Sequence, residues 1–231
     1  MPRKILIVDD EPLIVKGLRY SLLQDGYEID TAGDGEQALQ QIRSTGYDML
    51  LLDVMLPGIS GTELCQRVRE FSNVPIIMIT AKGEAMDKIM GLEYGADDYI
   101  TKPFNILEVK ARIKSLFRRS TAVAEEESSE NVITCKNLEI DLQQRVVMLR
   151  GEMVRVTARE FDLLAFLATH RGKVYPRDEL LGLVWKYDFM GDMRTVDVHI
   201  RRLREKIEDD SSKPEYILTK WGVGYYFTED N

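Results

Sequence analysis

The stretch Met49-Leu50-Leu51-Leu52-Asp53 decides the fold, because a wholly apolar run ends in a carboxylate. A run without polar alternation is typical of a parallel strand that is buried on both faces. Open α/β sheets gather their reactive groups at the carboxyl ends of such strands, so we expect Asp53 at that edge. A second run, residues 4–8, is followed by Asp9-Asp10-Glu11. Two strands that end in carboxylates predict an acidic pocket that can hold a hard divalent cation and bring a phosphoryl group to an aspartate.

Apolar runs and amphipathic stretches alternate up to about residue 120. This alternation predicts an α/β fold in which a doubly wound, five-stranded parallel sheet has helices on both faces, as in flavodoxin-like domains. The expected strands are 4–8, 28–32, 48–52, 75–80 and 97–101, and the expected helices are 12–25, 35–44, 61–71, 84–94 and 105–118.

The composition is that of a globular protein. Of 231 residues, 44% are hydrophobic and 30% are charged, which suits one large domain or two of ordinary size. No apolar run approaches the ~20 residues that span a bilayer, and the chain leads directly into its first strand, so we expect a cytoplasmic protein that does not enter membranes. Cys65 and Cys135 are far apart, which favours ordinary thiols over a metal or redox pair.

The net charge of −8 argues against nucleic acid only as an average. Residues 132–231 carry 16 basic and 17 acidic residues, net −1, and residues 1–131 carry the remaining 15 and 22, net −7. Five basic residues fall within 194–206. Local charge decides whether a face can meet phosphates, so the second part of the chain can still bind DNA.

The alternating pattern breaks at residues 120–131 (STAVAEEESSEN), which are rich in Ser and Glu and have no apolar periodicity. Such a stretch is typical of a flexible, self-repelling linker, and a short charged surface loop is the alternative. We therefore divide the chain into a first domain, 1–120, a linker, 121–131, and a second domain, 132–231.

The second domain has the pattern of a small α+β fold. Short alternating segments at 132–149 indicate an antiparallel sheet, and residues 215–227 indicate a hairpin around two glycines. Between them we expect helices at 158–170, 177–185 and 194–208. Thr157 followed by Glu160 is the capping-box pattern at the start of the first of these helices.

Two further strand ends add hydrogen-bond donors to the acidic pocket. Thr80 ends the fourth expected strand and Lys102 closes the fifth, so a hydroxyl and an ammonium lie at the edge that holds Asp53. A lone aspartate at a strand end is more often a helix cap or a solvated turn residue. Five such polar residues at four strand ends favour a phosphoryl-binding pocket instead.

These motifs resemble the receiver domain of bacterial response regulators over residues 1–120. The matching stretches are Val8-Asp9-Asp10-Glu11-Pro12, Leu52-Asp53-Val54-Met55-Leu56-Pro57-Gly58, Thr80-Ala81 and Asp97-Asp98-Tyr99-Ile100-Thr101-Lys102-Pro103-Phe104. The resemblance implies that a sensor histidine kinase phosphorylates Asp53. It also implies that Asp10, Asp53 and the backbone carbonyl of Met55 bind Mg²⁺, and that Asp9 shapes the pocket.

The resemblance assigns further roles around the phosphoryl group. Thr80 and Lys102 would hold that group through their hydroxyl and ammonium. Tyr99 would be the switch aromatic, which moves inward when Thr80 is drawn to the phosphate. The bond between Lys102 and Pro103 would be cis, which only proline makes inexpensive.

Many charges cluster on the fourth and fifth expected helices and the fifth strand, and a solvated face is the simple interpretation. The OmpR/PhoB subfamily, which the chain resembles, dimerises its active receivers through the matching surface. Transferred by position, three pairs would join two chains across a two-fold axis: Lys88 with Glu108, Asp97 with Arg112, and Asp98 with Arg119. Such surface pairs would set partner choice and register more than affinity.

Residues 194–204 have the pattern of a helix that reads DNA. Val196, Ile200, Leu203 and Ile207 repeat on one face, which should pack on the core. The remaining surface is expected to carry outward Arg194, Thr195, Val198, His199, Arg201 and Arg202. Arginine contacts to guanine or phosphate and a valine contact to a thymine methyl suit a major groove, although a basic helix face alone is usually just solvated.

The second domain resembles the winged-helix effector domain of OmpR/PhoB-type regulators over residues 132–231. The matching stretches are Thr157-Ala158-Arg159-Glu160-Phe161-Asp162-Leu163-Leu164, Arg177-Asp178-Glu179-Leu180-Leu181 with Trp185, residues 194–204, and Thr219-Lys220-Trp221-Gly222-Val223-Gly224-Tyr225-Tyr226-Phe227. The resemblance places the third helix in the major groove and the hairpin, as the wing, beside the minor groove. Trp221 stands where some members insert an arginine, which leaves Lys220 as a phosphate contact. Residues 186–193 correspond to the family's usual contact to RNA polymerase, with a purely structural loop as the alternative.

The sequence therefore predicts a two-component transcriptional regulator, a receiver joined to a winged helix-turn-helix, that is not an enzyme. Phosphorylation of Asp53 is expected to favour a homodimer that places two winged helices on tandem DNA half-sites. A Mg²⁺-dependent phosphatase is one rival, but it needs a general acid two residues after its nucleophile, where Met55 stands. A regulator that binds DNA without phosphorylation is the other rival.

Overall fold

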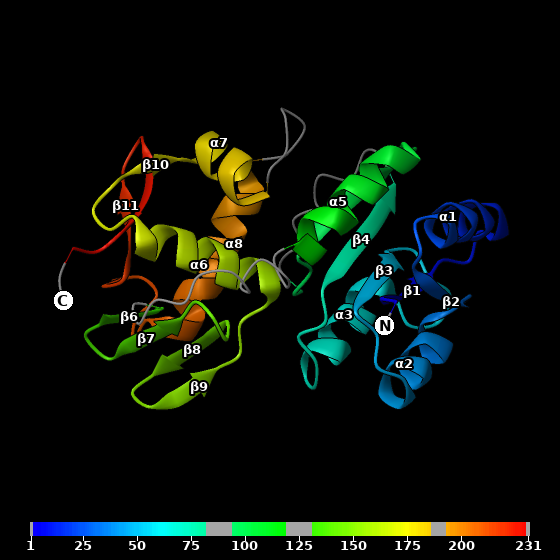
Figure 1. Cartoon of the computed structure of the whole chain (residues 1–231), viewed down its shortest axis with the longest axis horizontal. Helices are drawn as coiled ribbons and strands as arrows, with labels where there is room; N and C mark the ends of the chain where they lie inside the picture. The colour runs from blue at the N-terminus through cyan, green and yellow to red at the C-terminus, as the bar shows by residue number, and fades with distance from the viewer. Residues whose placement is uncertain (1, 82–93, 119–130, 186–192, 230–231) are drawn as a thin grey trace. The chain divides into compact units, whose positions relative to one another are not determined.

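The computed structural model describes residues 2–81, 94–118, 131–185 and 193–229 of the chain. These residues belong to two compact units, Met1–Lys114 and Ser115–Asn231 (Figure 1). The expected linker, except for Asn131, and nearly all of the expected helix 84–94 lie outside the described residues. Among the residues that are described, no helix is long and apolar enough to cross a bilayer.

The first unit is built on a five-stranded parallel sheet, which confirms the predicted α/β class. The strand order is β2-β1-β3-β4-β5. The strands are β1 (Lys4–Val8), β2 (Glu28–Ala32), β3 (Met49–Asp53), β4 (Ile76–Ala81) and β5 (Asp98–Lys102). All five residues of the central strand β3 are buried, because helices cover both faces of the sheet.

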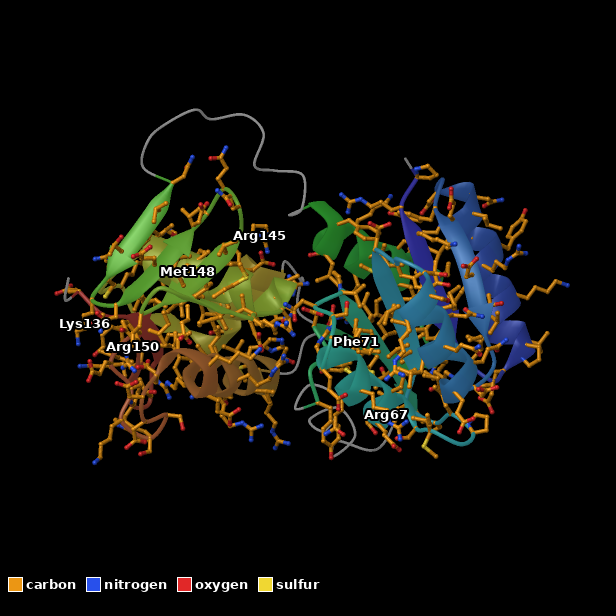
Figure 2. The ribbon with its side chains drawn as sticks, turned by 90° about the horizontal axis from the view of Figure 1, so that it is seen from below. Arg67, Phe71, Lys136, Arg145, Met148 and Arg150 are labelled. Carbon is orange, nitrogen blue, oxygen red and sulfur yellow. The ribbon has the colours of Figure 1, made fainter. Side chains whose placement is uncertain are left out.

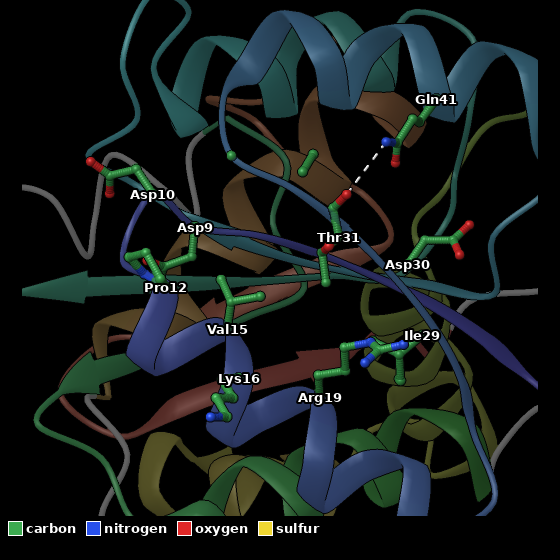
Figure 3. Close-up of a pocket in the computed structure, with 12 residues that line it drawn as sticks. Asp9, Asp10, Pro12, Val15, Lys16, Arg19, Ile29, Asp30, Thr31 and Gln41 are labelled. Atoms are coloured by element: carbon green, nitrogen blue, oxygen red, sulfur yellow. Dashed lines mark hydrogen bonds between the residues drawn. The ribbon is translucent and has the colours of Figure 1, made fainter.

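Helices cover the two faces of this sheet in the doubly wound manner. They are α1 (Pro12–Gln24), α2 (Gly35–Ser44), α3 (Gly61–Arg69) and α5 (Ile106–Arg118). In Figure 3, α2 and α3 lie on one side of the sheet, and α1 and α5 lie on the other. Asp34 and Ser60 cap α2 and α3 by accepting hydrogen bonds from backbone amides in the first turn.

The sheet register brings four polar strand ends to one edge. Val8 pairs with Leu52, and Asp53 pairs with Ile79, so the residues after β1 and at the end of β3 lie at one level. Ala81 pairs with Lys102 at the ends of β4 and β5. The carboxyl edge of the sheet therefore gathers the polar side chains that the sequence placed there.

The second unit combines two small antiparallel sheets with three helical segments. One sheet has the order β6-β7-β8-β9 and the other has the order β10-β12-β11. The first sheet comprises β6 (Val132–Cys135), β7 (Leu138–Asp141), β8 (Val146–Leu149) and β9 (Glu152–Val154). The helical part comprises α6 (Ala158–Thr169), α7 (Arg177–Leu180) continued by the π-helical turn Leu181–Trp185, and α8 (Arg194–Ile207). Its core gathers apolar side chains from these elements, with Trp185 among those that are fully buried. Three helical segments with small antiparallel sheets match the predicted α+β winged-helix fold.

The second sheet contains one strand that the sequence did not predict. β10 (Tyr175–Pro176) pairs with β12 (Gly224–Phe227), which also pairs with β11 (Ile217–Lys220) as the expected hairpin. Two residues are too few for an alternating pattern to be visible in the sequence. A Cβ atom at Gly224 would lie 1.9 Å from the carbonyl oxygen of Tyr175, so glycine is required for this close strand approach.

Three hairpin turns of the first sheet each hold a basic residue at positive φ. Lys136, Arg145 and Arg150 have φ of 51°, 57° and 55°, and Figure 2 shows them at the turns. Lys136 Nζ lies 2.7 Å from Glu215, Arg145 lies 2.8 Å from Asp162, and Arg150 is paired with Asp209. These ion pairs tie the β6–β9 sheet to α6 and to the segment between α8 and β11.

Candidate functional site

Three carboxylates form the acidic pocket, which consists of Asp9, Asp10 and Asp53. One oxygen from each lies within 4.8 Å of the others. Asp9 and Asp53 are buried at 2% and 4% exposure, whereas Asp10 is exposed. Carboxylates held this close repel one another, so the pocket favours a divalent cation.

Lys102 supplies the positive charge beside the acidic pocket. Its Nζ donates to Asp53 Oδ2 at 3.0 Å and to Glu11 Oε1 at 2.7 Å, and it lies 3.0 Å from Asp9 Oδ2. The Lys102–Pro103 peptide bond is cis, which confirms that prediction. One ammonium therefore serves three carboxylates from the end of β5.

The proton affinities of the pocket follow from burial and charge. Burial raises the pKa of the Asp53 carboxyl above its ordinary value, and the charge of Asp9 adds to this, while Lys102 and a hydrogen bond with the Met55 backbone oppose it. Burial alone would lower the pKa of Lys102, but its hydrogen bonds to Glu11, Asp53 and Asp9 raise it above the ordinary value. The ammonium stays charged, and burial and the neighbouring carboxylate oppose the negative charge of Asp53.

Thr80 and Tyr99 lie behind the pocket on β4 and β5. The Thr80 hydroxyl is buried, and its Oγ1 has no hydrogen-bond partner in the described part of the chain. Buried hydroxyls rarely lack a hydrogen-bond partner, so this one indicates that Thr80 binds a ligand. Tyr99 is also buried, and its backbone amide donates to Asp98 Oδ1 at 2.8 Å.

Two backbone features shape the floor and the rim of the pocket. A Cβ atom at Gly61 would lie 1.9 Å from the carbonyl oxygen of Asp53, so only glycine lets α3 begin this close to the end of β3. The side chain of Met55 is exposed, and its backbone forms a hydrogen bond with Asp53. The backbone at Met55 is therefore next to the carboxylate that the sequence singled out.

A groove of about 720 Å³ extends from the acidic pocket along α1 to β2 (Figure 3). Asp9 and Asp10 line one end, and Lys16 and Arg19 of α1 line the side that faces β2. Gln41 of α2 donates to the carbonyl oxygen of Thr31 at 3.4 Å and covers part of the outer edge of β2. Asp9 and Asp10 are therefore the carboxylates of the acidic pocket that this groove reaches.

The expected dimer face is described only in part, because Lys88 and Arg119 lie outside the described residues. Arg112 is buried and donates to Asp98 Oδ1 at 2.9 Å and to Glu108 Oε1 at 2.6 Å. Asp97 is buried and accepts from Arg69 at 3.0 Å and from the Ile76 amide at 2.9 Å. Within one chain, Arg112 therefore pairs with Asp98 and Glu108. For Arg112 to pair with Asp97 of a second chain, Arg112 would have to leave these partners and Asp97 would have to leave Arg69.

The outward face of α8 is narrower than the sequence predicted. Arg194 and Arg201 are exposed, and Val198 lies between them by helical spacing although it is itself buried. The outward assignment of Thr195, Val198, His199 and Arg202 is wrong, because all four are buried. His199 packs edge-on against Trp185 with ring centroids 5.0 Å apart, and Arg202 donates to the buried Glu160 at 2.6 Å. His199 and Arg202 lie beside the apolar stripe and are buried because they contact Trp185 and Glu160, which belong to other elements. The helical pattern alone does not show these partners.

The hairpin of β11 and β12 carries the other expected DNA contacts. Trp221 is 90% exposed in the turn, and Lys220 beside it is also exposed. Arg204 of α8 donates to the carbonyl oxygen of Ile217 at 2.6 Å and to Thr219 Oγ1 at 2.8 Å. The hairpin is therefore fixed to the helix while its tip stays exposed.

A second network, missed by the sequence analysis, joins α7, α8 and β12. Arg177 Nε donates to Asp197 Oδ1 at 2.6 Å, and the Tyr225 hydroxyl donates to the same oxygen at 2.6 Å. Burial raises the pKa of Tyr225 to about 12, and Asp197 adds to this. The three residues are separated by 20 and 28 positions along the chain, so no local motif could reveal the network.

Comparisons with known proteins agree with this arrangement. Residues 5–114 match the family model "Response regulator receiver domain", and residues 151–227 match "Transcriptional regulatory protein, C terminal". The chain is similar to the response regulator DrrB of Thermotoga maritima, an OmpR/PhoB homolog, at 36% identity over 99% of this chain and 100% of that chain, with a TM-score of 0.53. It is similar to a mutant of RitR at 31% identity over 98% of this chain and 99% of that chain, with a TM-score of 0.76. A two-component response regulator from Clostridium difficile matches at 32% identity over 52% of this chain and 99% of that chain, with a TM-score of 0.51.

Proposed function

This chain belongs to the OmpR/PhoB family of response regulators, and on that premise we propose that Asp53 is its phosphoacceptor. A DNA-binding response regulator has DNA and a sensor kinase as partners. One observation carries the choice of residue. Asp53 is buried at the carboxyl edge of the sheet, within 4.8 Å of two other carboxylates and 3.0 Å from Lys102.

The residues of the acidic pocket fit Mg²⁺, which prefers carboxylate oxygens together with water and phosphate oxygens. Asp10 and Asp53 would hold the ion, with the backbone carbonyl of Met55, and Asp9 would shape the pocket. When bound, the ion would neutralise charge between the carboxylate and the phosphoryl group. The surplus of three carboxylates over one ammonium supports this assignment.

The chain's own residues then perform the transfer. A carboxylate oxygen of Asp53 attacks phosphorus, and the bond from phosphorus to the donor breaks, so that its electron pair leaves with the donor. Lys102 and the Thr80 hydroxyl bind the oxygens of the phosphoryl group, which supplies the partner that Thr80 Oγ1 lacks. Movement of Thr80 makes room for Tyr99 to turn inward, and this biases the surface near β5.

Phosphorylation would favour a receiver homodimer through the face that carries Asp98, Glu108 and Arg112. The face carries both signs of charge, which suits a two-fold interface. Arg112 already contacts Asp98 and Glu108 within one chain, so a partner chain would extend an existing charged cluster. Asp97 would join only after leaving Arg69, and Lys88 and Arg119 complete the face that the sequence predicts.

The second unit would place α8 in the major groove of DNA, with the exposed Arg194 and Arg201 toward the bases and phosphates. The exposed wing residues Lys220 and Trp221 would lie over the neighbouring backbone and minor groove. Two such units in a receiver dimer would occupy tandem half-sites. Residues 186–193 would contact RNA polymerase.

Asp53→Asn tests the phosphoacceptor. The full chain is incubated with acetyl phosphate and Mg²⁺, and phosphoryl incorporation, dimer formation and DNA affinity are measured together. The wild type and the control Asp25→Asn, which alters a surface pair with Lys110, should respond to acetyl phosphate, and Asp53→Asn should not. Equal responses in all three proteins would disprove the proposal, and sustained turnover of a phosphomonoester would favour the phosphatase.

A further inference from the structure

Glu11 is the acidic residue beside the pocket that has no role in the proposed transfer. Its Oε1 accepts from Lys102 Nζ at 2.7 Å, which is shorter than the 3.0 Å contacts of Lys102 with Asp9 and Asp53. Asp9 and Asp53 belong to the group of carboxylates that can share a cation, and Glu11 does not. Glu11 is therefore the carboxylate that competes for Lys102 when the others are otherwise engaged.

The local structure shows why Glu11 faces Lys102. Glu11 is the N-cap residue of α1, but its side chain makes no capping hydrogen bond. Its backbone amide donates to Asp9 Oδ1 at 2.8 Å, which fixes the turn at the end of β1. The side chain is 57% exposed and reaches a lysine 91 positions away, instead of the amides of its own helix. The side chain at the N-cap of α1 therefore binds Lys102 instead of a backbone amide in the first turn of the helix.

We propose that Glu11 is a positioning residue that restrains Lys102 and thereby slows phosphoryl transfer to Asp53. The proposal rests on the proposed function of Asp53. Before transfer, the exposed Glu11 gives the ammonium a third contact beside those with Asp9 and Asp53. To bind an incoming phosphoryl group, Lys102 must leave Glu11, because an ammonium on a flexible stem cannot serve both at full strength.

The expected effect is modest because the contact is exposed. Removing the contact should raise the rate of phosphorylation by about two- to fivefold, the range for an exposed ion pair of this kind. Loss of negative charge near an anionic donor would also raise the rate of phosphorylation. The test must therefore separate the effect of the Glu11 contact with Lys102 from the effect of the Glu11 charge. Glu11→Asp keeps the charge but is one methylene shorter, and aspartate at this position caps α1 instead.

The experiment measures the rate of phosphoryl incorporation from acetyl phosphate with saturating Mg²⁺ in the full chain. Glu11→Gln and Glu11→Asp should both be faster than the wild type. Glu28→Gln, which removes an exposed charge at the start of β2, should match the wild type. In a Lys102→Ala background, Glu11→Gln should change the rate no more than Glu28→Gln does.

Each outcome decides the proposal. If Glu11→Asp behaves as the wild type while Glu11→Gln is faster, charge alone acts and the restraint on Lys102 is refuted. If neither variant is faster, or if Glu11→Gln accelerates equally without Lys102, the proposal is also refuted. Absence of phosphorylation in the wild type would instead remove the proposed function of Asp53, and this inference with it.

Discussion

Arg201 and Arg202 are adjacent in α8, and the structure gives them opposite tasks. Arg202 is 7% exposed and donates to the fully buried Glu160 at 2.6 Å. Arg201 is 50% exposed and lies 3.6 Å from Glu205, which is also exposed. We expect Arg202→Ala to destabilise the second unit, and Arg201→Ala to weaken DNA binding without destabilising it.

The magnitudes follow from the partners that remain. Removing one partner of a buried pair costs about 3–5 kcal/mol, because a charge is left without compensation. Glu160 would keep Lys206 at 2.6 Å and the Thr157 amide at 2.7 Å, so the loss for Arg202→Ala should lie near the lower end, about 3 kcal/mol. Arg201→Ala should change stability by less than about 0.5 kcal/mol. It should lower DNA affinity by about 1–3 kcal/mol if Arg201 contacts a base.

Tryptophan fluorescence during urea unfolding measures the first effect, because the two tryptophans of the chain, Trp185 and Trp221, both lie in the second unit. Buried Trp185 reports unfolding of that unit separately from the first. Fluorescence anisotropy with a labelled DNA duplex measures affinity at several salt concentrations. Unchanged unfolding for Arg202→Ala, or unchanged affinity for Arg201→Ala, would refute the division of tasks between them.

Three further outcomes are expected. Because burial raises the pKa of Asp53, ionisation of this carboxyl opposes folding above its unfolded value of 3.8, so Asp53→Asn should raise the free energy of unfolding at pH 7 without divalent ions. Chemical denaturation in EDTA measures this, and a less stable variant would contradict the pKa argument. Tyr225, with its pKa raised to about 12, contributes stability that is complete below pH 10 and is lost between pH 10 and about 12, and ultraviolet titration of the wild type against Tyr225→Phe should show one phenolate that forms late. Trp221→Ala should weaken DNA binding with no change in stability, whereas an equal affinity in anisotropy would mean that the wing tip does not touch DNA.

The sequence predicted the receiver half of the fold well because its elements are marked locally. The apolar runs at β1, β3 and β4 are buried without interruption, and capping signals bound the helices between them. The polar residues of the pocket were found because parallel strands deliver their carboxyl ends to one edge. Strand periodicity alone could not show that Glu11 reaches Lys102, since that contact depends on side-chain direction after the fold has formed.

Helix α8 shows where pattern reasoning fails. Helical spacing separated Val196, Ile200 and Leu203 from the outward face correctly. It could not place His199 and Arg202, which lie at the boundary of the apolar stripe. Trp185 and Glu160 decide their direction, and both come from other elements of the unit. Boundary positions of an amphipathic helix are set by tertiary partners, so their exposure cannot be read from the helix alone.

Charge balance distinguishes the reactive cluster from the structural ones. Glu160 is one carboxylate with two cations, Arg202 and Lys206, at 2.6 Å each, and needs nothing more from solution. The acidic pocket is the reverse, because Asp9 and Asp53 share the single ammonium of Lys102 with Glu11, and Asp10 adds a further carboxylate. Burial alone therefore does not mark a functional site, since Glu160 is buried as fully as Asp9 and Asp53. An excess of negative charge is balanced when a cation is taken up from solution, which is what the proposed Mg²⁺ site would do and the Glu160 cluster has no need to do.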